Sequence, residues 1–257
     1  MAKKIFKVLL DVGITICIAV ISICGYNIYE FYSEMHESKE KTVEIYNTVK
    51  ETGHKEEESG RWVPTKETYN ELHTQNSDYV GYLLWDNDLI SEPILQGVTN
   101  QAYIRSDFNG NYDVWGSIFL ESGIPLDSDN LMIYGHSLAG AKYDNNKFSQ
   151  LQNMLDQEFY ESNKTFKIYW ENSITSYEVI TADCFDTSED GWNYTQCRFI
   201  DEADKANWVD QVRNHTQIQT DLDYSAADKY VTFQTCHDDY SSLRYVVVAK
   251  QVNDKSY

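Results

Sequence analysis

The chain is poor in basic residues. Among its 257 residues, Lys and Arg number 21 against 41 Asp and Glu, so the formal net charge is −20. A protein that binds nucleic acid needs a basic face for the phosphates. The charge balance therefore argues against a nucleic-acid partner, and solubility is the simpler explanation of the acidic excess.

Motifs for metals and phosphates are also missing. No set of Cys and His residues has the spacing of a zinc site, and no glycine-rich loop of the phosphate-binding type is present. The sequence therefore predicts neither a metal nor a cofactor. Proline is scarce, with 3 residues against 20 tyrosines, which suits a sheet-rich domain with solvated outer faces.

Near the N-terminus, residues 12–26 form an uninterrupted run of apolar and small residues. The stretch from 5 to 29 is long enough to cross a bilayer as a helix, and Lys3, Lys4 and Lys7 precede it. By the positive-inside rule, the N-terminus then lies in the cytoplasm and the rest of the chain outside. A cleaved signal peptide is the alternative, but no clear small-residue cleavage site follows the run. We expect a single-pass membrane protein.

Two helices are expected between this run and the main domain. Residues 30–50 are polar, with apolar positions at helical spacing, namely Val43, Ile45, Tyr46 and Val49. Residues 51–59 form a charged hinge. A second, short helix begins at Thr65, where Thr65 and Thr68 provide a weak cap and Tyr69 and Leu72 share one face. We therefore divide the chain into residues 1–29, an N-terminal tip and anchor; 30–75, membrane-proximal helices and hinge; and 76–257, the main domain.

The main domain alternates short β-rich runs with turns. The expected strands are 80–85, 93–96, 116–120, 130–135, 166–170, 176–184, 230–235 and 244–251. Helices are expected at about 147–155 and 201–214, the second with Ala206, Val209 and Val212 at three-residue spacing. Eight short strands with inserted helices suit a closed, mostly antiparallel barrel.

A cysteine follows one of these strands directly. Residues Thr232-Phe233-Gln234-Thr235-Cys236 place a thiol at the end of an apolar run, and Arg244 follows eight residues later at the head of the next run. A lone cysteine is commonly a buried small hydrophobe. A cationic or imidazole neighbour, however, makes a thiol a good nucleophile. With Arg244 so placed, Cys236 is a candidate nucleophile.

Two histidines are candidates for the imidazole. His136 ends the apolar run Leu131-Met132-Ile133-Tyr134, directly after Gly135, and could serve as a general acid. His237 is the rival, because it follows the thiol in the sequence. Neighbouring side chains on an extended backbone point to opposite faces, so His237 aims away from Cys236 unless the chain turns there. We therefore favour His136.

These residues resemble the sortases, the cysteine transpeptidases of Gram-positive cell surfaces. Thr-Phe-Gln-Thr-Cys is close to their TLxTC signature, and Tyr134-Gly135-His136 matches the strand end that carries their histidine. The N-terminal helices, and a helix between the sixth strand and the cysteine strand, resemble class B. The similarity spans about residues 76–252. Two departures affect substrate detail: Phe233 replaces the usual leucine, and Ser137-Leu138 stands where class B members usually have Asn-Met.

The resemblance implies a mostly β fold with added helices: a closed eight-stranded β-barrel preceded by N-terminal helices and a transmembrane helix. It implies that Cys236 attacks a Thr carbonyl in the C-terminal sorting signal of a secreted protein, forming a thioacyl enzyme. An amine of a peptidoglycan precursor then takes the acyl group. By the same resemblance, His136 transfers protons and Arg244 stabilises the oxyanion or holds substrate carbonyls. Thr235, Gln234 and Ser137 are the expected substrate-binding residues.

Several alternatives remain open at this stage. A surface cysteine peptidase would use the same thiol with water as the acceptor, and a pilus-polymerising sortase would use a pilin lysine. A non-catalytic adhesin or scaffold is expected to lose the Cys, His or Arg, and this sequence keeps all three. Cys184 and Cys197 flank a polar loop and could form a disulfide outside the cell, but the sequence does not show that their Cβ atoms approach each other.

Overall fold

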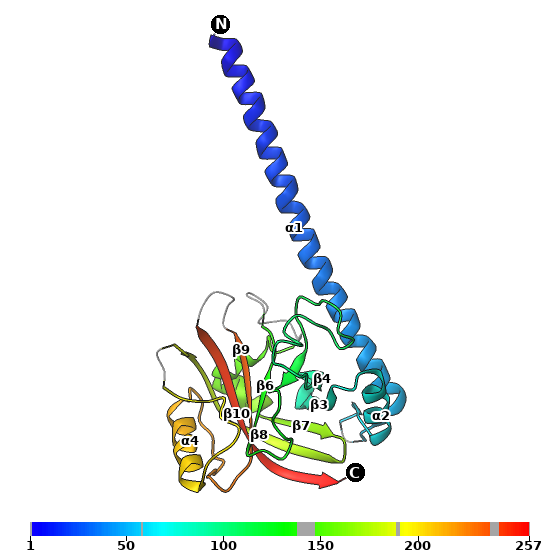
Figure 1. The fold of residues 1–257 in the computed structure, drawn as a ribbon, viewed down its shortest axis with the longest axis vertical. Helices are drawn as coiled ribbons and strands as arrows, with labels where there is room; N and C mark the ends of the chain where they lie inside the picture. The colour runs from blue at the N-terminus through cyan, green and yellow to red at the C-terminus, as the bar shows by residue number, and fades with distance from the viewer. Residues whose placement is uncertain (1, 58, 138–146, 189–190, 237–241, 257) are drawn as a thin grey trace.

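A closed β-barrel forms the centre of the computed structural model, which describes residues 2–57, 59–137, 147–188, 191–236 and 242–256 (Figure 1). The barrel strands are β3 (Tyr79–Trp85), β4 (Ser91–Leu95), β5 (Ile118–Leu120), β6 (Asn130–Tyr134), β7 (Thr165–Trp170), β8 (Ser173–Asp186), β9 (Tyr230–Cys236) and β10 (Leu243–Ser256). Within the described residues, these eight strands close in the order β10-β8-β7-β3-β4-β5-β6-β9. The expected closed barrel is confirmed.

The pairing is mostly antiparallel, as expected, with two exceptions. β4 pairs with β5, and β6 pairs with β9, in parallel register. β8 and β10 are longer than expected and pair along their whole length, with two register shifts that let the strands bend around the barrel. The parallel pairing brings the ends of β6 and β9 to the same edge of the barrel.

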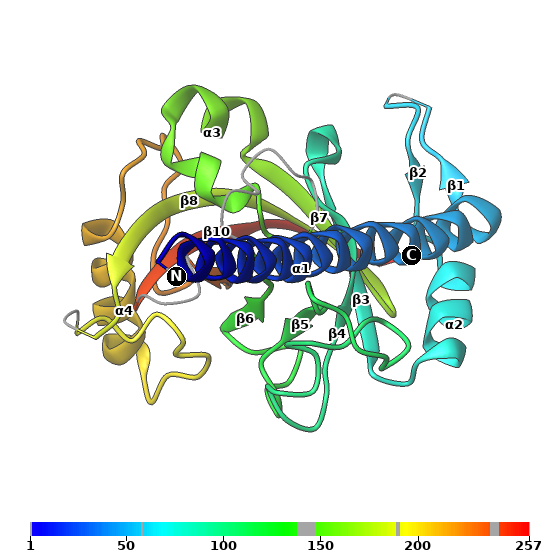
Figure 2. The ribbon, with the colours of Figure 1, turned by 90° about the horizontal axis from the view of Figure 1, so that it is seen from above.

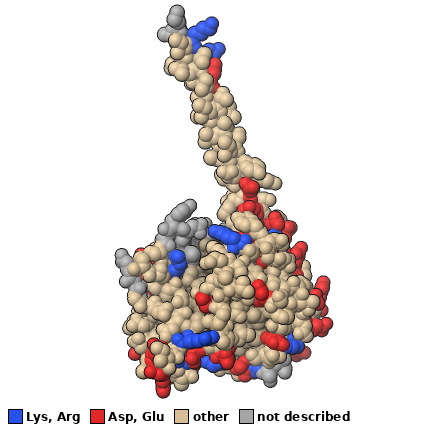
Figure 3. Space-filling model, viewed as in Figure 1, with Lys and Arg blue, Asp and Glu red and all other residues tan. Residues whose placement is uncertain are grey.

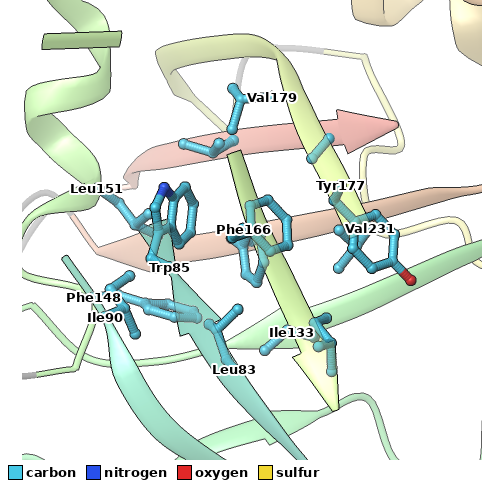
Figure 4. Close-up of a cluster of buried hydrophobic side chains, with 14 of the residues drawn as sticks. Leu83, Trp85, Ile90, Ile133, Phe148, Leu151, Phe166, Tyr177, Val179 and Val231 are labelled. Atoms are coloured by element: carbon cyan, nitrogen blue, oxygen red, sulfur yellow. The ribbon is translucent and has the colours of Figure 1, made fainter. Parts of the chain in front are cut away.

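The barrel interior is filled by apolar side chains from every side of the wall. Figure 4 shows part of this cluster, with Trp85 and Phe166 at its middle and Leu83, Ile133 and Val231 around them. The rings of Trp85 and Phe166 lie 4.5 Å apart between centroids. Burial of such aromatic side chains supplies much of the driving force for folding.

Part of the barrel wall is buried on both faces. In β3, Leu83 and Trp85 belong to the interior cluster, whereas Tyr82 and Leu84 belong to a second cluster outside the barrel. A strand covered on both faces has a continuous apolar sequence, and residues 79–85 show one. The covering elements are the N-terminal helices.

The helix α1 (Ala2–Thr52) joins the predicted membrane-spanning run and the predicted amphipathic helix in one uninterrupted helix. Its C-terminal part packs on the barrel, where Ile45 and Val49 are buried in the second cluster. Its N-terminal part stands clear of the barrel as an apolar rod, with lysines at the tip (Figure 3). This part is long and apolar enough to cross a membrane, judged by length and composition.

The second short helix is confirmed. α2 (Lys66–Gln75) begins after Thr65, whose hydroxyl accepts a hydrogen bond from the Thr68 backbone N–H, while the Thr68 hydroxyl accepts one from the Thr65 N–H. Tyr69 and Leu72 share the buried face and pack in the second cluster.

The charged hinge expected at 51–59 is wrong in part. The helix α1 continues to Thr52, and the chain then forms a small antiparallel hairpin, β1 (His54–Lys55) with β2 (Trp62–Val63). The arginine that follows the charged run ties this hairpin to the barrel, because Arg61 forms ion pairs with Asp86 and Asp88 at the end of β3. Within the run itself, Glu56 forms an ion pair with Lys167 of β7 at 3.2 Å, so this charge also joins the hairpin to the barrel.

The helix expected at 147–155 is also wrong in detail. Residues 147–150 form turns, a 3₁₀ helix (η2, Leu151–Leu155) follows, and an unexpected helix α3 occupies Gln157–Asn163. Asp156 separates the two, because its extended backbone ends η2 and its carboxylate accepts the Phe159 N–H at 2.9 Å, which starts α3.

The helix between β8 and β9 is confirmed as α4 (Glu202–Asn214), which begins after the capping residue Asp201. Trp208, Val209 and Val212 pack on the outer faces of β8, β9 and β10 as a third cluster. Figure 2 shows α4 on the side of the barrel away from α2. The helices thus brace opposite sides of the wall, and the strand ends of β6, β9 and β10 lie between them.

Candidate active site

Three neighbouring strands carry the predicted catalytic residues at one end of the barrel. β6 runs parallel to β9, and β9 runs antiparallel to β10. The ends of β6 and β9 and the start of β10 therefore meet at the same edge. This is the end of the barrel from which α1 rises toward the N-terminus, whereas β10 finishes at the opposite end beside the C-terminus (Figure 1).

Cys236 and Arg244 are partners across the β9–β10 ladder. Cys236 is the last residue of β9, and the antiparallel register pairs it with Arg244. The Arg244 side chain is half-buried, and its guanidinium donates a hydrogen bond to the Leu243 carbonyl at 2.8 Å. The structure thus brings together two residues that the sequence separates by an eight-residue step.

His136 lies beside this pair through the parallel ladder. β6 ends with Tyr134, which pairs with Gln234, and the Gly135 N–H donates to the Gln234 carbonyl at 3.3 Å. The chain from β6 therefore reaches the end of β9 at the position of His136. The ladder places His136, Cys236 and Arg244 on three adjacent strand ends.

Gly135 is required at this turn. The ring of Phe148 packs against the backbone there, so a Cβ at position 135 would lie only 2.7 Å from a ring carbon. Phe148 also donates its backbone N–H to the His136 carbonyl at 3.1 Å. Its ring meets that of Phe233 edge-on, with centroids 5.4 Å apart. The backbone of His136 is therefore held by a buried aromatic residue from a different segment.

The predicted substrate-binding residues differ in their access to solvent. Gln234 is half-buried, and its side-chain oxygen accepts a hydrogen bond from the Tyr194 hydroxyl at 3.2 Å. Thr235 is 1% exposed, and its hydroxyl oxygen is buried without a hydrogen bond to any residue that the structure describes. Ser137 is 4% exposed. A substrate role for these three residues stays a prediction.

An aromatic cluster beside the site was not anticipated from the sequence. Phe185 pairs with Arg244 across the β8–β10 ladder, and its ring lies 5.5 Å from Tyr194 and 5.4 Å from Trp192. Trp192 in turn stacks on His215 at 4.6 Å. Aromatic residues in the segment after β8 were a visible signal, but only the long-range fold shows that this segment covers the start of β10.

The two other thiols of the barrel domain are free cysteines, so the disulfide considered between Cys184 and Cys197 is absent from the described structure. Burial raises the pKa of the Cys184 thiol, and burial raises that of Cys197 to about 11. Because the thiolate is the nucleophilic form, both are poor nucleophiles near neutral pH.

Two further expectations concern the rival histidine and metal binding. His237, the rival to His136, and Leu138 lie outside the described residues. Among the residues that the structure describes, no group of three or more His, Cys, Asp or Glu side chains is arranged to hold a metal ion.

Comparison with known proteins identifies the family. The sortase domain matches residues 88–252 of this chain. Sortase B of Staphylococcus aureus is 28% identical over 237 residues, which cover 91% of this chain and 92% of the relative.

Solved structures agree with the sequence comparison. The Staphylococcus aureus sortase B-substrate complex matches with a TM-score of 0.75 and 26% identity, over 86% of this chain and 99% of that chain. A sortase B complexed with triglycine matches with a TM-score of 0.72 and 26% identity, over 85% of this chain and 98% of that chain. The sortase domain covers most of the barrel, and the similarity to sortase B covers 91% of this chain. This chain therefore belongs to the sortase family and is a class B cysteine transpeptidase.

Proposed function

We propose that this transpeptidase cleaves a C-terminal sorting signal of secreted proteins after a Thr residue and transfers the acyl group to an amine of a cell-wall precursor. The observation that supports it most is the convergence of three strand ends, which pairs Arg244 with Cys236 and brings His136 beside them. The substrate complex of the Staphylococcus aureus relative is consistent with a peptide substrate.

In the first step, the Cys236 thiolate attacks the carbonyl carbon of the Thr and forms a tetrahedral intermediate. The intermediate collapses as the bond between the Thr carbonyl and the following amide nitrogen breaks. His136 donates a proton to that nitrogen, so the C-terminal fragment leaves as a neutral amine. A thioester between Cys236 and the substrate remains.

Arg244 stabilises the negative charge of the tetrahedral oxygen. A guanidinium stays protonated at any working pH and presents several N–H donors in a fixed plane. Donors aimed at a developing oxyanion lower the barrier because the charge forms there only in the transition state. The ladder pairing of Arg244 with Cys236 supports this role.

In the second step, an amine attacks the thioester. Its nitrogen forms the new amide bond and gives a proton to His136, and the Cys236 thiolate leaves. The sortase B bound to triglycine makes a glycine amine a reasonable acceptor. Gln234, Thr235 and Ser137 contribute to substrate binding in this proposal.

We also propose that residues 1–29 anchor the protein in the membrane with the N-terminus in the cytoplasm, and that residues 30–75 connect this anchor to the catalytic barrel of residues 76–257 outside. The exposed apolar part of α1 supports the anchor. The active-site end of the barrel is the end from which α1 rises, so it would face the membrane (Figure 1). Substrates held at the membrane surface would then approach the site directly.

A peptide library tests the reaction. The full chain in detergent is incubated with peptides that have Thr fixed at one position and all other positions random, with and without triglycine. We expect cleavage after Thr and, with triglycine, a product carrying the new amide bond. Release of free acid at the same rate with or without amine would instead support a peptidase. Transfer only to lysine-containing pilin-like peptides would support pilus polymerisation.

The anchor has its own test. We expect the protein isolated from membranes to keep its N-terminal residues, and protease added to wall-stripped cells to cut beyond Lys50. A mature chain that begins near Gly25 would indicate a cleaved signal peptide, and a protected barrel would contradict the proposed orientation.

A further inference from the structure

Lys147 is a buried cation at the junction of three segments. It is 6% exposed, and its ammonium donates to the Glu92 carboxylate of β4 at 2.9 Å and to the Thr42 hydroxyl of α1 at 3.2 Å. Glu92 is only 2% exposed. Buried charges persist in proteins when they are paired and hydrogen-bonded, and removing one partner is strongly destabilising. The ion pair therefore fixes the position of Lys147 against both β4 and α1.

The backbone of Lys147 adds a second observation. Its φ angle is +49°, in the left-handed region that favours glycine. A lysine in this conformation accepts an energetic cost that glycine would avoid, and such costs are concentrated at functional positions. A lysine therefore stands at a position whose backbone conformation glycine would adopt at lower cost.

The residue after Lys147 holds the catalytic histidine. Phe148 donates its N–H to the His136 carbonyl at 3.1 Å, and its fully buried ring packs against Gly135. Figure 4 shows this ring inside the barrel cluster next to Ile90 and Leu151. Lys147 is thus linked to His136 through its covalent neighbour Phe148 and the backbone hydrogen bond that Phe148 makes.

We propose that Lys147, through its ion pair with Glu92, is a positioning residue for His136, and that Thr42 makes α1 part of this support. The catalytic importance of His136 rests on the proposed function; the structural link from Lys147 to His136 does not. Lys147 contacts no reacting atom in this proposal. It sets the place from which His136 exchanges protons.

Lys205 provides a matched control. Its side chain is 8% exposed, the same as that of Lys147, and it forms an ion pair with Asp129 at 2.6 Å. It lies on α4, and Asp129 precedes the start of β6, at the barrel end opposite His136. Lys205→Met therefore removes a comparably buried lysine without touching the Phe148 turn, although its partner Asp129 is more exposed than Glu92, at 45% against 2%.

The test compares Lys147→Met with Lys205→Met in the full chain in detergent. Three quantities are measured: the thermal unfolding midpoint, the NMR titration of isotope-labelled His136, and kcat and KM with the peptide selected from the library. We expect both variants to lower the unfolding midpoint. Lys147→Met alone should shift the His136 signal and its titration, and should lower kcat by roughly tenfold to a hundredfold with little change in KM.

A double variant keeps the test informative if Lys147→Met folds poorly. Lys147→Met with Glu92→Met removes both charges and should recover the unfolding midpoint, while kcat stays low and the His136 signal stays shifted. Recovery of kcat together with stability would overturn the proposal, as would an unchanged His136 signal in Lys147→Met. A His136→Ala variant with normal turnover would instead contradict the proposed function, and the NMR comparison would still decide whether Lys147 positions His136.

Discussion

The two ends of the barrel differ in the functional groups that they bring together. At the end that carries His136, Cys236 and Arg244, reactive groups converge on adjacent strand ends. At the opposite end lies an open hollow of about 470 Å³, where the starts of β6, β8 and β9 meet the ends of β7 and β10. A hollow of this size would attract attention as a ligand site, but the proposed catalytic residues lie at the other end.

The side chains around the hollow are engaged with their neighbours. Lys229 donates to the Asp127 carbonyl at 2.8 Å, and Asp254 accepts from the Thr175 hydroxyl at 3.0 Å. No thiol or imidazole is among its lining residues, all of which the structure describes. The comparison teaches that a site is identified by which functional groups the strand register brings together, and that hollow volume alone is a poor guide.

The largest expected effect is at the thiol. Cys236→Ala should abolish peptide cleavage, because it removes the proposed thiol nucleophile and burial raises the pKa of the nearby Cys184 thiol, while the free energy of unfolding changes by about 1–3 kcal/mol or less. Chromatography of the peptide products and thermal unfolding measure the two quantities. Cleavage within tenfold of the unmodified protein would remove Cys236 from the mechanism.

The second-largest effect on turnover is expected at the imidazole of His136. His136→Ala should lower turnover by roughly 10²–10⁴-fold, the usual cost of losing a general acid–base group. His237→Ala should be mild. Steady-state rates of both variants under the same conditions make the comparison, and a larger loss in His237→Ala would show that the chain turns after Cys236 and that the choice of histidine is wrong.

Two substitutions at Arg244 distinguish the effect of side-chain geometry from the effect of charge. Arg244→Lys should be nearly as harmful as Arg244→Ala, on the order of 10²–10³-fold in kcat, because lysine keeps the charge but loses the planar fork that can hold an oxyanion. Near-normal kcat in the Lys variant would mean that Arg244 acts as a point charge.

Two threonines on β9 give a matched pair for stability. Thr235 has a buried hydroxyl without a hydrogen bond among the described residues, whereas the Thr232 hydroxyl donates to the Asn130 side-chain oxygen at 2.9 Å. Thr232→Val should lower the free energy of unfolding by about 1–3 kcal/mol, because it leaves that buried oxygen without this donor, and Thr235→Val should not lower it. Denaturant unfolding measures both. If Thr235 binds substrate through its hydroxyl, KM should also rise in Thr235→Val. A loss of stability in Thr235→Val equal to that in Thr232→Val would contradict this account of the site.

The smallest effect is expected at the hollow. Lys229→Met removes an exposed cation at the opposite end of the barrel, so turnover should stay within about twofold and the free energy of unfolding within about 0.5 kcal/mol. The same rate assay as for Arg244→Lys applies. A loss comparable to that of Arg244→Lys would mean that the hollow takes part in the reaction.

Local patterns predict much of this fold. The eight strands were found to within a few residues because apolar β-rich runs are bounded by turns, and the capping pattern at Thr65 marked α2. The break at Asp156 was missed, since a single capping carboxylate decides it. Local patterns also do not determine which strands pair in parallel, and that pairing is what brings His136 beside Cys236.

The candidate site could be predicted where a motif carries it, and it was hidden where its contacts are long-range. Cys236, His136 and Arg244 follow from signature residues and spacing. The aromatic cluster around Phe185 and the ion pair between Lys147 and Glu92 join residues far apart in the chain. No local pattern marks such partners, because the overall fold determines which segments meet.

The most direct test of the account is the location of the acyl group during turnover. The full chain is mixed with a cleavable peptide, quenched in acid, digested and analysed by mass spectrometry. The account predicts a thioester adduct on Cys236 and none on Cys184 or Cys197, whose pKa values burial raises, that of Cys197 to about 11. An adduct on either of those thiols, or turnover without any adduct on Cys236, would contradict the assignment of Cys236 as the nucleophile.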